Sequence, residues 1–173
     1  FQIMIYKYNM GFENGGGYMS KEFYTVRGYE LKDSNEKLLT SAMEDYLEMI
    51  YRSSQDEPNI RIKTIAKRLN VKDSSATKMV QKLGDLGMLE YEKYGSITLT
   101  QKGRDIGAYL LQRHAIIERF FRLIGCEGDV LVHTEKVEHV LDDATIENLN
   151  LLCQFMHENP DVFERYCAYK MTD

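Results

Sequence analysis

Hydrophobic residues recur every three or four positions along most of the chain beyond residue 40, and this spacing is typical of helices that bury one face. The first such stretch begins at Ser41, which with Glu44 forms an S-x-x-E capping box. Two more short stretches, IRIKTIAKRLN and DSSATKMVQKL, are separated by a tight turn, and Asp73 suits the N-cap position of the second. Two short helices joined by such a turn predict a helix-turn-helix.

The pattern changes to an alternation of apolar and polar residues in MLEYEKYGSITLT, which predicts a β-hairpin that turns at Tyr94–Gly95 and forms a wing. Beyond it, RDIGAYLLQRHAIIERFFRLIG predicts a long helix. Two further helical patterns precede Pro160, and a short last helix follows it. We therefore expect a mainly α protein, with a winged helix-turn-helix domain over residues 39–102 and an all-helical domain over residues 103–173.

The first 38 residues follow neither pattern and contain three consecutive glycines, Gly15–Gly17. We expect residues 1–38 to be a largely irregular N-terminal extension. Adjacent glycine codons can form a purine tract of the kind that ribosomes bind, and this tract would lie a short distance before Met19. Translation that starts at Met19 would make residues 1–18 a translated leader, a hypothesis that mass spectrometry of the protein from its host can test.

Length and composition are those of an ordinary folded protein, because the 173 residues are 43% hydrophobic and 28% charged and include only two prolines. No apolar run approaches the roughly 20 residues that cross a bilayer, and no signal-peptide pattern is present. We expect a cytoplasmic protein with no membrane partner. The three cysteines, Cys126, Cys153 and Cys167, are too widely spaced for a zinc knuckle or a disulfide framework, and we expect them to be reduced.

The net charge of −5 is distributed unevenly along the chain. Residues 60–104 contain ten basic and four acidic residues, whereas residues 1–59 and 105–173 are both net acidic. A basic block of this kind predicts a face that binds nucleic acid, with a merely solvated basic surface as the alternative interpretation.

The basic block includes the second helix of the predicted helix-turn-helix. Its face opposite Met79, Val80 and Leu83 consists of short hydroxyls, an amide and lysines, the groups that reach phosphates and base edges when a helix enters the major groove. The candidate DNA-binding residues are Ser74, Ser75, Thr77, Lys78, Gln81 and Lys82, with Lys93 and Tyr94 on the wing. Any solvated helix face is polar, so the prediction of a double-stranded DNA partner depends on this face, the basic block and the wing together.

Six acidic and histidine residues are spaced so that they converge. Two lie three residues apart on the first predicted helix, and three follow an i, i+3, i+4 pattern on a later helix. The complete set is Asp45, Glu48, His114, Glu135, Glu138 and His139. Carboxylates and imidazoles that project inward from facing helices form sites for one or two divalent ions, although each group alone also fits a solvated surface. The absence of an H-E-x-x-H sequence argues against a metalloprotease.

From about Leu39 to Met156, the sequence resembles the manganese transport regulator family, the manganese branch of the diphtheria toxin repressor superfamily. The resemblance rests on SAMEDYLEMIY, SSATKMVQKLGDLGMLEYEKYGSITLTQKG, RHAIIERFFRLIG and EKVEH. It implies a manganese-responsive, homodimeric repressor that binds operators of metal-ion uptake genes. It also implies that the helical domain, residues 103–173, binds the metal and dimerises.

This family binds two manganese ions per subunit through six side chains, and all six residue types match in this chain. The resemblance assigns one ion to Asp45, Glu48 and His114. It assigns the other ion chiefly to Glu138 and His139, with Glu135 as a bridge. The iron-responsive branch has methionine in place of Asp45 and cysteine in place of Glu135, and hard oxygen ligands at these two positions favour manganese.

Two other classes of protein share parts of this pattern. A winged-helix regulator that senses a small organic ligand would need an apolar pocket, and chelators would leave its DNA binding unchanged. An enzyme with a dinuclear carboxylate centre would use similar ligands, but its basic helix-turn-helix would have no role. We therefore expect a regulator and not an enzyme.

Overall fold

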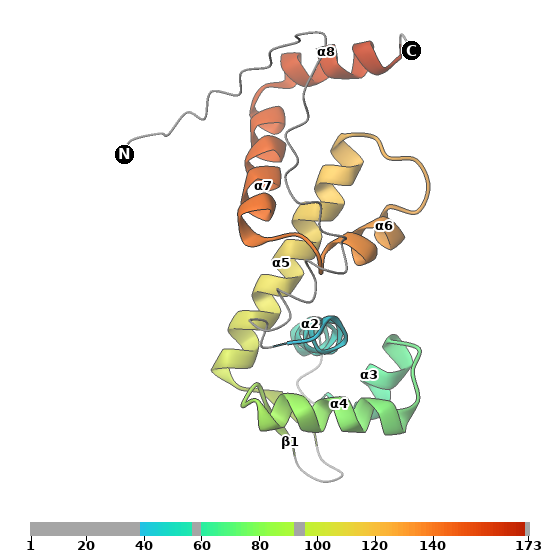
Figure 1. The fold of residues 1–173 in the computed structure, drawn as a ribbon, viewed down its shortest axis with the longest axis vertical. Helices are drawn as coiled ribbons and strands as arrows, with labels where there is room; N and C mark the ends of the chain where they lie inside the picture. The colour runs from blue at the N-terminus through green and yellow to red at the C-terminus, as the bar shows by residue number, and fades with distance from the viewer. Residues whose placement is uncertain (1–38, 57–59, 92–95, 172–173) are drawn as a thin grey trace, which may run out of the picture. The chain divides into compact units, whose positions relative to one another are not determined.

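Helices dominate the structure, a computed structural model that describes residues 39–56, 60–91 and 96–171 (Figure 1). The elements in chain order are α2 (Ser41–Asp56), α3 (Ile62–Arg68), α4 (Asp73–Asp85), β1 (Leu89–Tyr91), β2 (Ile97–Leu99), α5 (Gln101–Leu123), α6 (Val130–Val137), α7 (Asp143–Glu158) and α8 (Pro160–Lys170). All described residues belong to one unit of the chain, Glu36–Asp173. The prediction of a mainly α fold is confirmed, while the predictions for residues 1–38 lie outside the described residues.

The start of α2 differs from the predicted capping box. α2 begins at Ser41, but Thr40 caps it, because the Glu44 amide donates to Thr40 O at 3.0 Å and the Met43 amide reaches Thr40 Oγ1 at 3.4 Å. The predicted Ser41–Glu44 capping box is therefore wrong. As a result, the Glu44 carboxylate is available for contacts elsewhere.

The helix-turn-helix forms because α2, α3 and α4 bury their apolar faces in one core. Leu47 of α2, Ile65 of α3 and Val80 of α4 are fully buried, as their helical spacing predicts. α4 begins with Asp73 as its first helical residue and Lys72 as its N-cap, so the predicted cap was wrong by one residue.

The wing is a two-stranded antiparallel hairpin, as predicted, with Leu89 of β1 opposite Leu99 of β2. It starts just after Gly87, which adopts a φ of +71° beyond the end of α4. Glycine occupies this left-handed conformation without the strain that a Cβ would cause, so the chain can turn from helix into strand. The hairpin turn, with Lys93 and Tyr94, lies outside the described residues.

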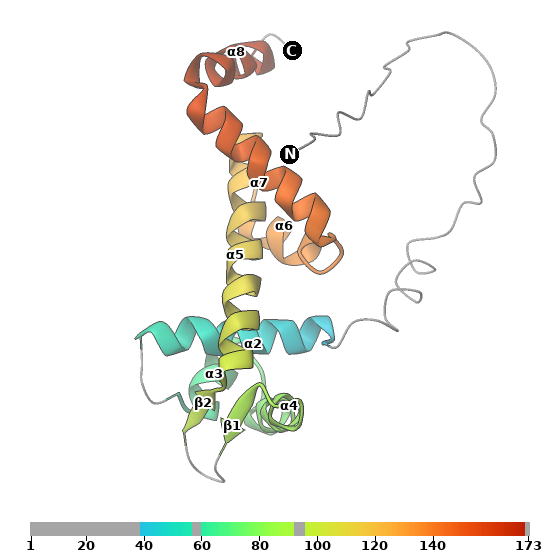
Figure 2. The same ribbon diagram turned by 90° about the vertical axis from the view of Figure 1, so that its left-hand side faces the viewer.

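The long helix α5 follows the wing and contacts α2, α6 and α7 (Figure 2). Thr100 caps its start by accepting a hydrogen bond from the Gly103 amide at 3.1 Å. Further along, a Cβ added to Gly107 would lie 2.6 Å from Tyr51 Cβ, so only glycine lets α5 cross α2 this closely. The predicted domain boundary between residues 102 and 103 falls in the first turn of α5 and stays a prediction.

A second, smaller core forms where α5 packs against α7, around the buried side chains of Ile117 and Ile146. α8 begins at Pro160, and Lys170 Nζ at its end donates to Ile124 O, just past the last turn of α5, at 2.8 Å. The three cysteines are free thiols, as predicted. Within the described ranges, no helix combines the length and apolar character that crossing a bilayer requires.

Candidate functional site

The six predicted ligands come from α2, α5, α6 and the turn after α6, which meet near the crossing of α5 and α2. α2 carries Asp45 and Glu48, α5 carries His114, and α6 carries Glu135. The remaining two, Glu138 and His139, lie at the C-cap of α6 and in the turn that follows, rather than on a continuous helix as predicted. The Val140 amide donates to Val137 O at 3.0 Å, which closes this turn.

The inner group consists of Glu48, His114 and Glu138, whose ligand atoms all lie within 4.8 Å of one another. The three residues are buried. His114 Nδ1 lies 2.8 Å from Glu138 Oε2 and 4.0 Å from Glu48 Oε1. The hydrogen bond with Glu138 raises the pKa of His114, although burial acts in the opposite direction. A buried imidazole between two carboxylates is a donor set that fits a divalent cation.

The outer group consists of Asp45, Glu138 and His139, and it shares Glu138 with the inner group. His139 Nε2 lies 3.0 Å from Asp45 Oδ1 and 3.7 Å from Glu138 Oε1. The carboxylates of Asp45 and Glu44 raise the pKa of His139 to about 9. The His139 and Asp45 side chains are 16% and 40% exposed, so the outer group is less buried than the inner group.

Glu135 lies at the margin of the inner group and belongs to neither set of converging atoms. Its Oε1 is 3.8 Å from His114 Nδ1, and its side chain is 53% exposed. Partial burial of its carboxyl group, together with the negative charge of Glu138, raises the pKa of Glu135. The family resemblance implied that Glu135 bridges two ions, whereas in the structure Glu138 is the carboxylate common to both groups.

Three charged residues that the sequence analysis did not assign to the site lie beside these groups. Arg52 Nη2 is 2.7 Å from Glu48 Oε1, and Glu44 Oε2 is 2.8 Å from both Arg113 Nη2 and His139 Nδ1. Burial alone would raise the pKa of Glu44, but hydrogen bonds from His139 and Arg113 lower it below its ordinary value. The sequence signal that could have found Glu44 is its spacing of four residues from Glu48, which places both on one face of α2.

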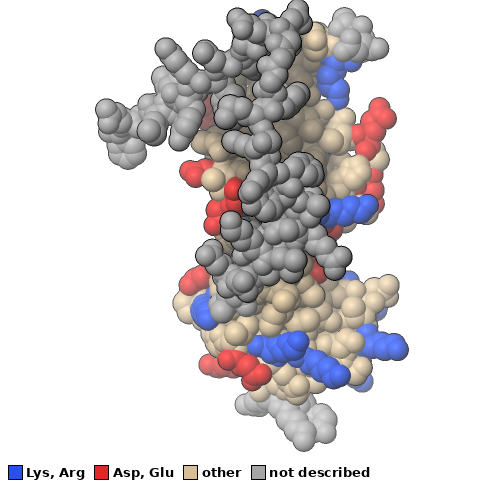
Figure 3. All heavy atoms as spheres, in the orientation of Figure 1, with Lys and Arg blue, Asp and Glu red and all other residues tan. Residues whose placement is uncertain are grey.

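The candidate DNA-binding face of α4 points away from the core. Its exposed residues are Ser74, Ser75, Lys78, Gln81 and Lys82. Thr77 is half-buried, and its hydroxyl donates to Asp73 O at 2.8 Å, which leaves its oxygen able only to accept from DNA. Figure 3 shows lysine and arginine side chains gathered over the region of α3 and α4. Lys93 and Tyr94, the predicted wing contacts, lie outside the described residues.

Two protein families match consecutive parts of the chain. Residues 38–97 match the family described as "Iron dependent repressor, N-terminal DNA binding domain". Residues 100–165 match the family described as "Iron dependent repressor, metal binding and dimerisation domain". The two ligand groups therefore join elements from both matched regions, because α2 lies in the first and α5 and α6 lie in the second.

Individual relatives agree with these matches. The chain is 42% identical to the HTH-type transcriptional regulator MntR of Lysinibacillus sphaericus (strain C3-41) over 132 residues, which are 76% of this chain and 95% of that protein. It is similar in structure to the manganese regulator SloR, with a TM-score of 0.58 and 29% identity over 65% of this chain and 54% of SloR. The metal-dependent transcriptional regulator MtsR matches with a TM-score of 0.61 and 29% identity over 68% of this chain and 55% of MtsR.

The chain spans about half the length of these two solved proteins and nearly the whole length of the MntR relative. The two family matches together cover most of the chain, in the order expected for a DNA-binding region followed by a metal-binding region. The chain therefore belongs to the iron-dependent repressor family, whose members are metal-dependent, DNA-binding transcriptional regulators and not enzymes.

Proposed function

We propose that this protein is a manganese-responsive repressor of metal-ion uptake genes, and that metal binding favours its DNA-competent dimer. The observation that carries the proposal is the pair of ligand groups that share Glu138 and join α2 to α5 and α6. α2 belongs to the core of the winged helix-turn-helix, so a metal ion held there acts directly on the DNA-binding half. The names of the relatives, MntR and the manganese regulator SloR, support manganese as the metal.

Two manganese ions per subunit are proposed, one for each ligand group. The proposed ligands are Asp45, Glu48, His114, Glu135, Glu138 and His139. Bound manganese would supply the positive charge that four neighbouring carboxylates require. Carboxylate oxygens are hard ligands, and manganese, the weakest binder in the usual order of divalent metals, depends on them for its affinity. Glu138 would contribute to both groups, and Glu135, at the margin of the inner group, would be a further ligand.

Manganese binding should release protons. The pKa of His139 is about 9, so its ring is protonated at neutral pH, whereas a metal binds only the neutral ring. The apparent affinity for manganese should therefore rise with pH from about pH 6 to about pH 8, with about one proton released from His139 per subunit near neutrality. Calorimetry in buffers of different ionisation enthalpy would count these protons. An affinity that does not change with pH would remove His139 from the ligand set.

Internal cations hold the carboxylates together in the metal-free protein. Arg52 pairs with Glu48, Arg113 pairs with Glu44, and His139 has a raised pKa, so the repulsion among the acidic residues is partly offset. Metal binding would then exchange the Arg52–Glu48 pair and the proton on His139 for metal–ligand bonds from α2, α5, the end of α6 and the turn that follows it. α2 also packs in the helix-turn-helix core, so a change in its position would also shift α4. A coupling free energy of about 1–3 kcal/mol between metal binding and DNA binding is ordinary for such a link.

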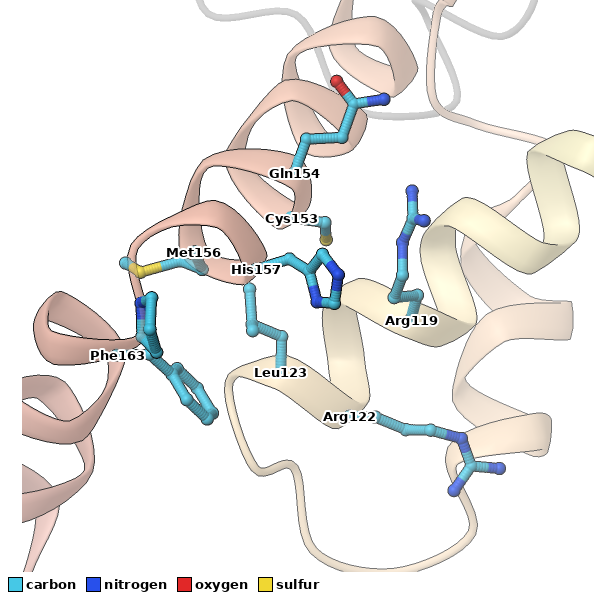
Figure 4. Close-up of a pocket in the computed structure, with 9 residues that line it drawn as sticks. Arg119, Arg122, Leu123, Cys153, Gln154, Met156, His157 and Phe163 are labelled. Carbon is cyan, nitrogen blue, oxygen red and sulfur yellow. The ribbon is translucent and has the colours of Figure 1, made fainter.

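A homodimer is proposed because paired DNA half-sites require two recognition helices related by a two-fold axis. The region matched as a dimerisation domain includes α7, on which Leu151, Leu152 and Phe155 are exposed. α7 also borders a hollow of about 640 Å³, between α5 and α8, that is lined in part by Leu123 and Phe163 (Figure 4). We propose that the part of α7 that exposes Leu151, Leu152 and Phe155 packs against a second copy of the chain.

DNA binding titrated with metal ions tests the proposal. Fluorescence anisotropy would follow the full-length protein on labelled DNA from a metal-transporter promoter, with manganese, iron(II), zinc or a chelator added at constant ionic strength. We expect manganese to tighten binding to this DNA but not to unrelated DNA of equal length, and the chelator to reverse the effect. DNA binding that ignores both manganese and chelator would favour a regulator that senses an organic ligand.

A further inference from the structure

Three charged side chains from different parts of the chain meet beside the outer group. Glu44 on α2 lies between Arg113 of α5 and His139 of the turn after α6, and its Oε2 is 2.8 Å from both partners. The Arg113 and Glu44 side chains are only 6% and 13% exposed. A carboxylate this well buried needs charged partners, so the contact differs from the solvated ion pairs of a protein surface.

The distances around His139 indicate what its ring nitrogen Nδ1 does. A carboxylate oxygen can only accept, so Glu44 Oε2 at 2.8 Å from Nδ1 requires an N–H donor there. Arg113 Nη2 is farther from Nδ1, at 3.4 Å. If Nδ1 instead accepted a hydrogen bond from Arg113, its lone pair would face a lone pair of Glu44 Oε2 at only 2.8 Å. Nδ1 therefore donates to Glu44, and Nε2, 3.0 Å from Asp45 Oδ1, is the nitrogen that would give up its hydrogen to bind a metal ion.

Arg113 and Glu44 each precede a proposed ligand in the sequence, His114 and Asp45 respectively. α5 and α2 therefore each present one proposed ligand and one supporting residue at fixed spacing. Without Arg113, the charge of Glu44 would add to the four carboxylates of the ligand groups. With Arg113 at 2.8 Å, that charge is compensated and the carboxylate stays directed at His139.

We propose that Glu44 and Arg113 are positioning residues for the outer metal group, an inference that rests on the proposed function. Glu44 holds the His139 ring so that Nε2 faces Asp45 and Glu138, and Arg113 holds Glu44. A carboxylate that accepts from the other ring nitrogen of a metal-binding histidine fixes the ring and raises its basicity. The inner group is built around His114, which is held by Glu138 instead. Loss of Glu44 should therefore weaken one of the two manganese-binding steps.

Calorimetry of the full-length protein with manganese, resolved into two binding steps, tests this inference. Glu44→Ala should weaken one step by about 10- to 100-fold and leave the other unchanged. Glu44→Gln keeps an oxygen that accepts from Nδ1 but lacks the charge. Its loss of manganese affinity should therefore be smaller than that of Glu44→Ala. Glu118→Gln is the matched control, because Glu118 lies near His114 along α5 but pairs with Arg122, and both steps should stay as in the parent.

A double variant separates positioning from folding. Arg113→Met alone leaves Glu44 buried without its cation, so the Tm of the metal-free protein should fall. Glu44→Leu combined with Arg113→Met should recover much of that Tm, because removing both partners of a buried ion pair is far less damaging than removing one. One manganese step should nevertheless stay weak in the double variant, since nothing then holds the His139 ring.

Three results would overturn the inference: parental affinity at both steps in Glu44→Ala, equal weakening of both steps, or full recovery of binding in the double variant. In each of these cases the parent protein still binds manganese, so the proposed function would stand. Failure of the parent itself to bind manganese would instead overturn the proposed function, and the inference with it.

Discussion

Glu138→Gln should abolish manganese-dependent DNA binding while the protein stays folded. Glu138 is only 2% exposed and is the carboxylate common to the inner and outer groups. The amide keeps the size of the side chain but removes its charge from both groups. Truncating one partner of a buried charge pair typically costs about 2–5 kcal/mol of binding free energy, which corresponds to a fall in affinity of roughly 30- to 5,000-fold. Manganese titrations followed by anisotropy of labelled promoter DNA would measure the loss.

Glu127→Gln is the control for this variant, because it removes the same charge from an exposed residue between α5 and α6. Its manganese stoichiometry and DNA affinity should equal those of the parent. Circular dichroism and thermal unfolding would establish that the Glu138 variant is folded. If that folded variant still bound two manganese ions with parental affinity, the two ligand groups would not be the metal site.

Gly107→Ala should destabilise the protein and impair its response to metal at the same time. The new Cβ would lie 2.6 Å from Tyr51 Cβ, so α5 and α2 would have to separate. Overpacking of this kind costs about 1–3 kcal/mol. For a contact this short we expect the upper end, which outweighs the roughly 1 kcal/mol that alanine gains over glycine inside a helix. The separation also moves Asp45 and Glu48 away from His114, so manganese affinity should fall.

Chemical denaturation of the metal-free protein and calorimetry with manganese would measure both effects. Gly84→Ala is the matched control, since its Cβ would meet Leu89 O at 3.6 Å, an ordinary van der Waals distance. That variant should be as stable as the parent or more so. Equal stability of the Gly107 and Gly84 variants would show that the α2–α5 crossing tolerates a side chain.

The proposed ligands could be predicted because short-range helical spacing determines which side chains share a face. Asp45 and Glu48 lie on one face of α2 for this reason alone. The end of α6 could not be predicted in the same way. Neither glycine nor proline marks the stretch after Val137, and His139 leaves the helix where it contacts Glu44, which is distant in the sequence.

The counter-charges around the site were also beyond sequence reasoning, because they depend on pairings between distant segments. Glu44 is 69 residues from Arg113 and 95 residues from His139. A local motif, the capping box with Ser41, assigned Glu44 a different role, but Thr40 caps the helix in the structure. The pairs Arg52–Glu48 and Arg113–Glu44 offset part of the repulsion among the carboxylates of the metal-free site.

The long helix α5 is hydrogen-bonded to other parts of the chain at both ends. In its first turn, Arg104 Nη1 donates to Leu99 O of the wing at 2.6 Å, and beyond its last turn Lys170 Nζ donates to Ile124 O at 2.8 Å. A helix held in this way resists local opening, because contacts at both ends must break first. His114, midway along it, is already ordered before any ion arrives. A ligand on such a helix needs little ordering when an ion binds, so less conformational entropy is lost at His114 than would be lost at a ligand on a loop.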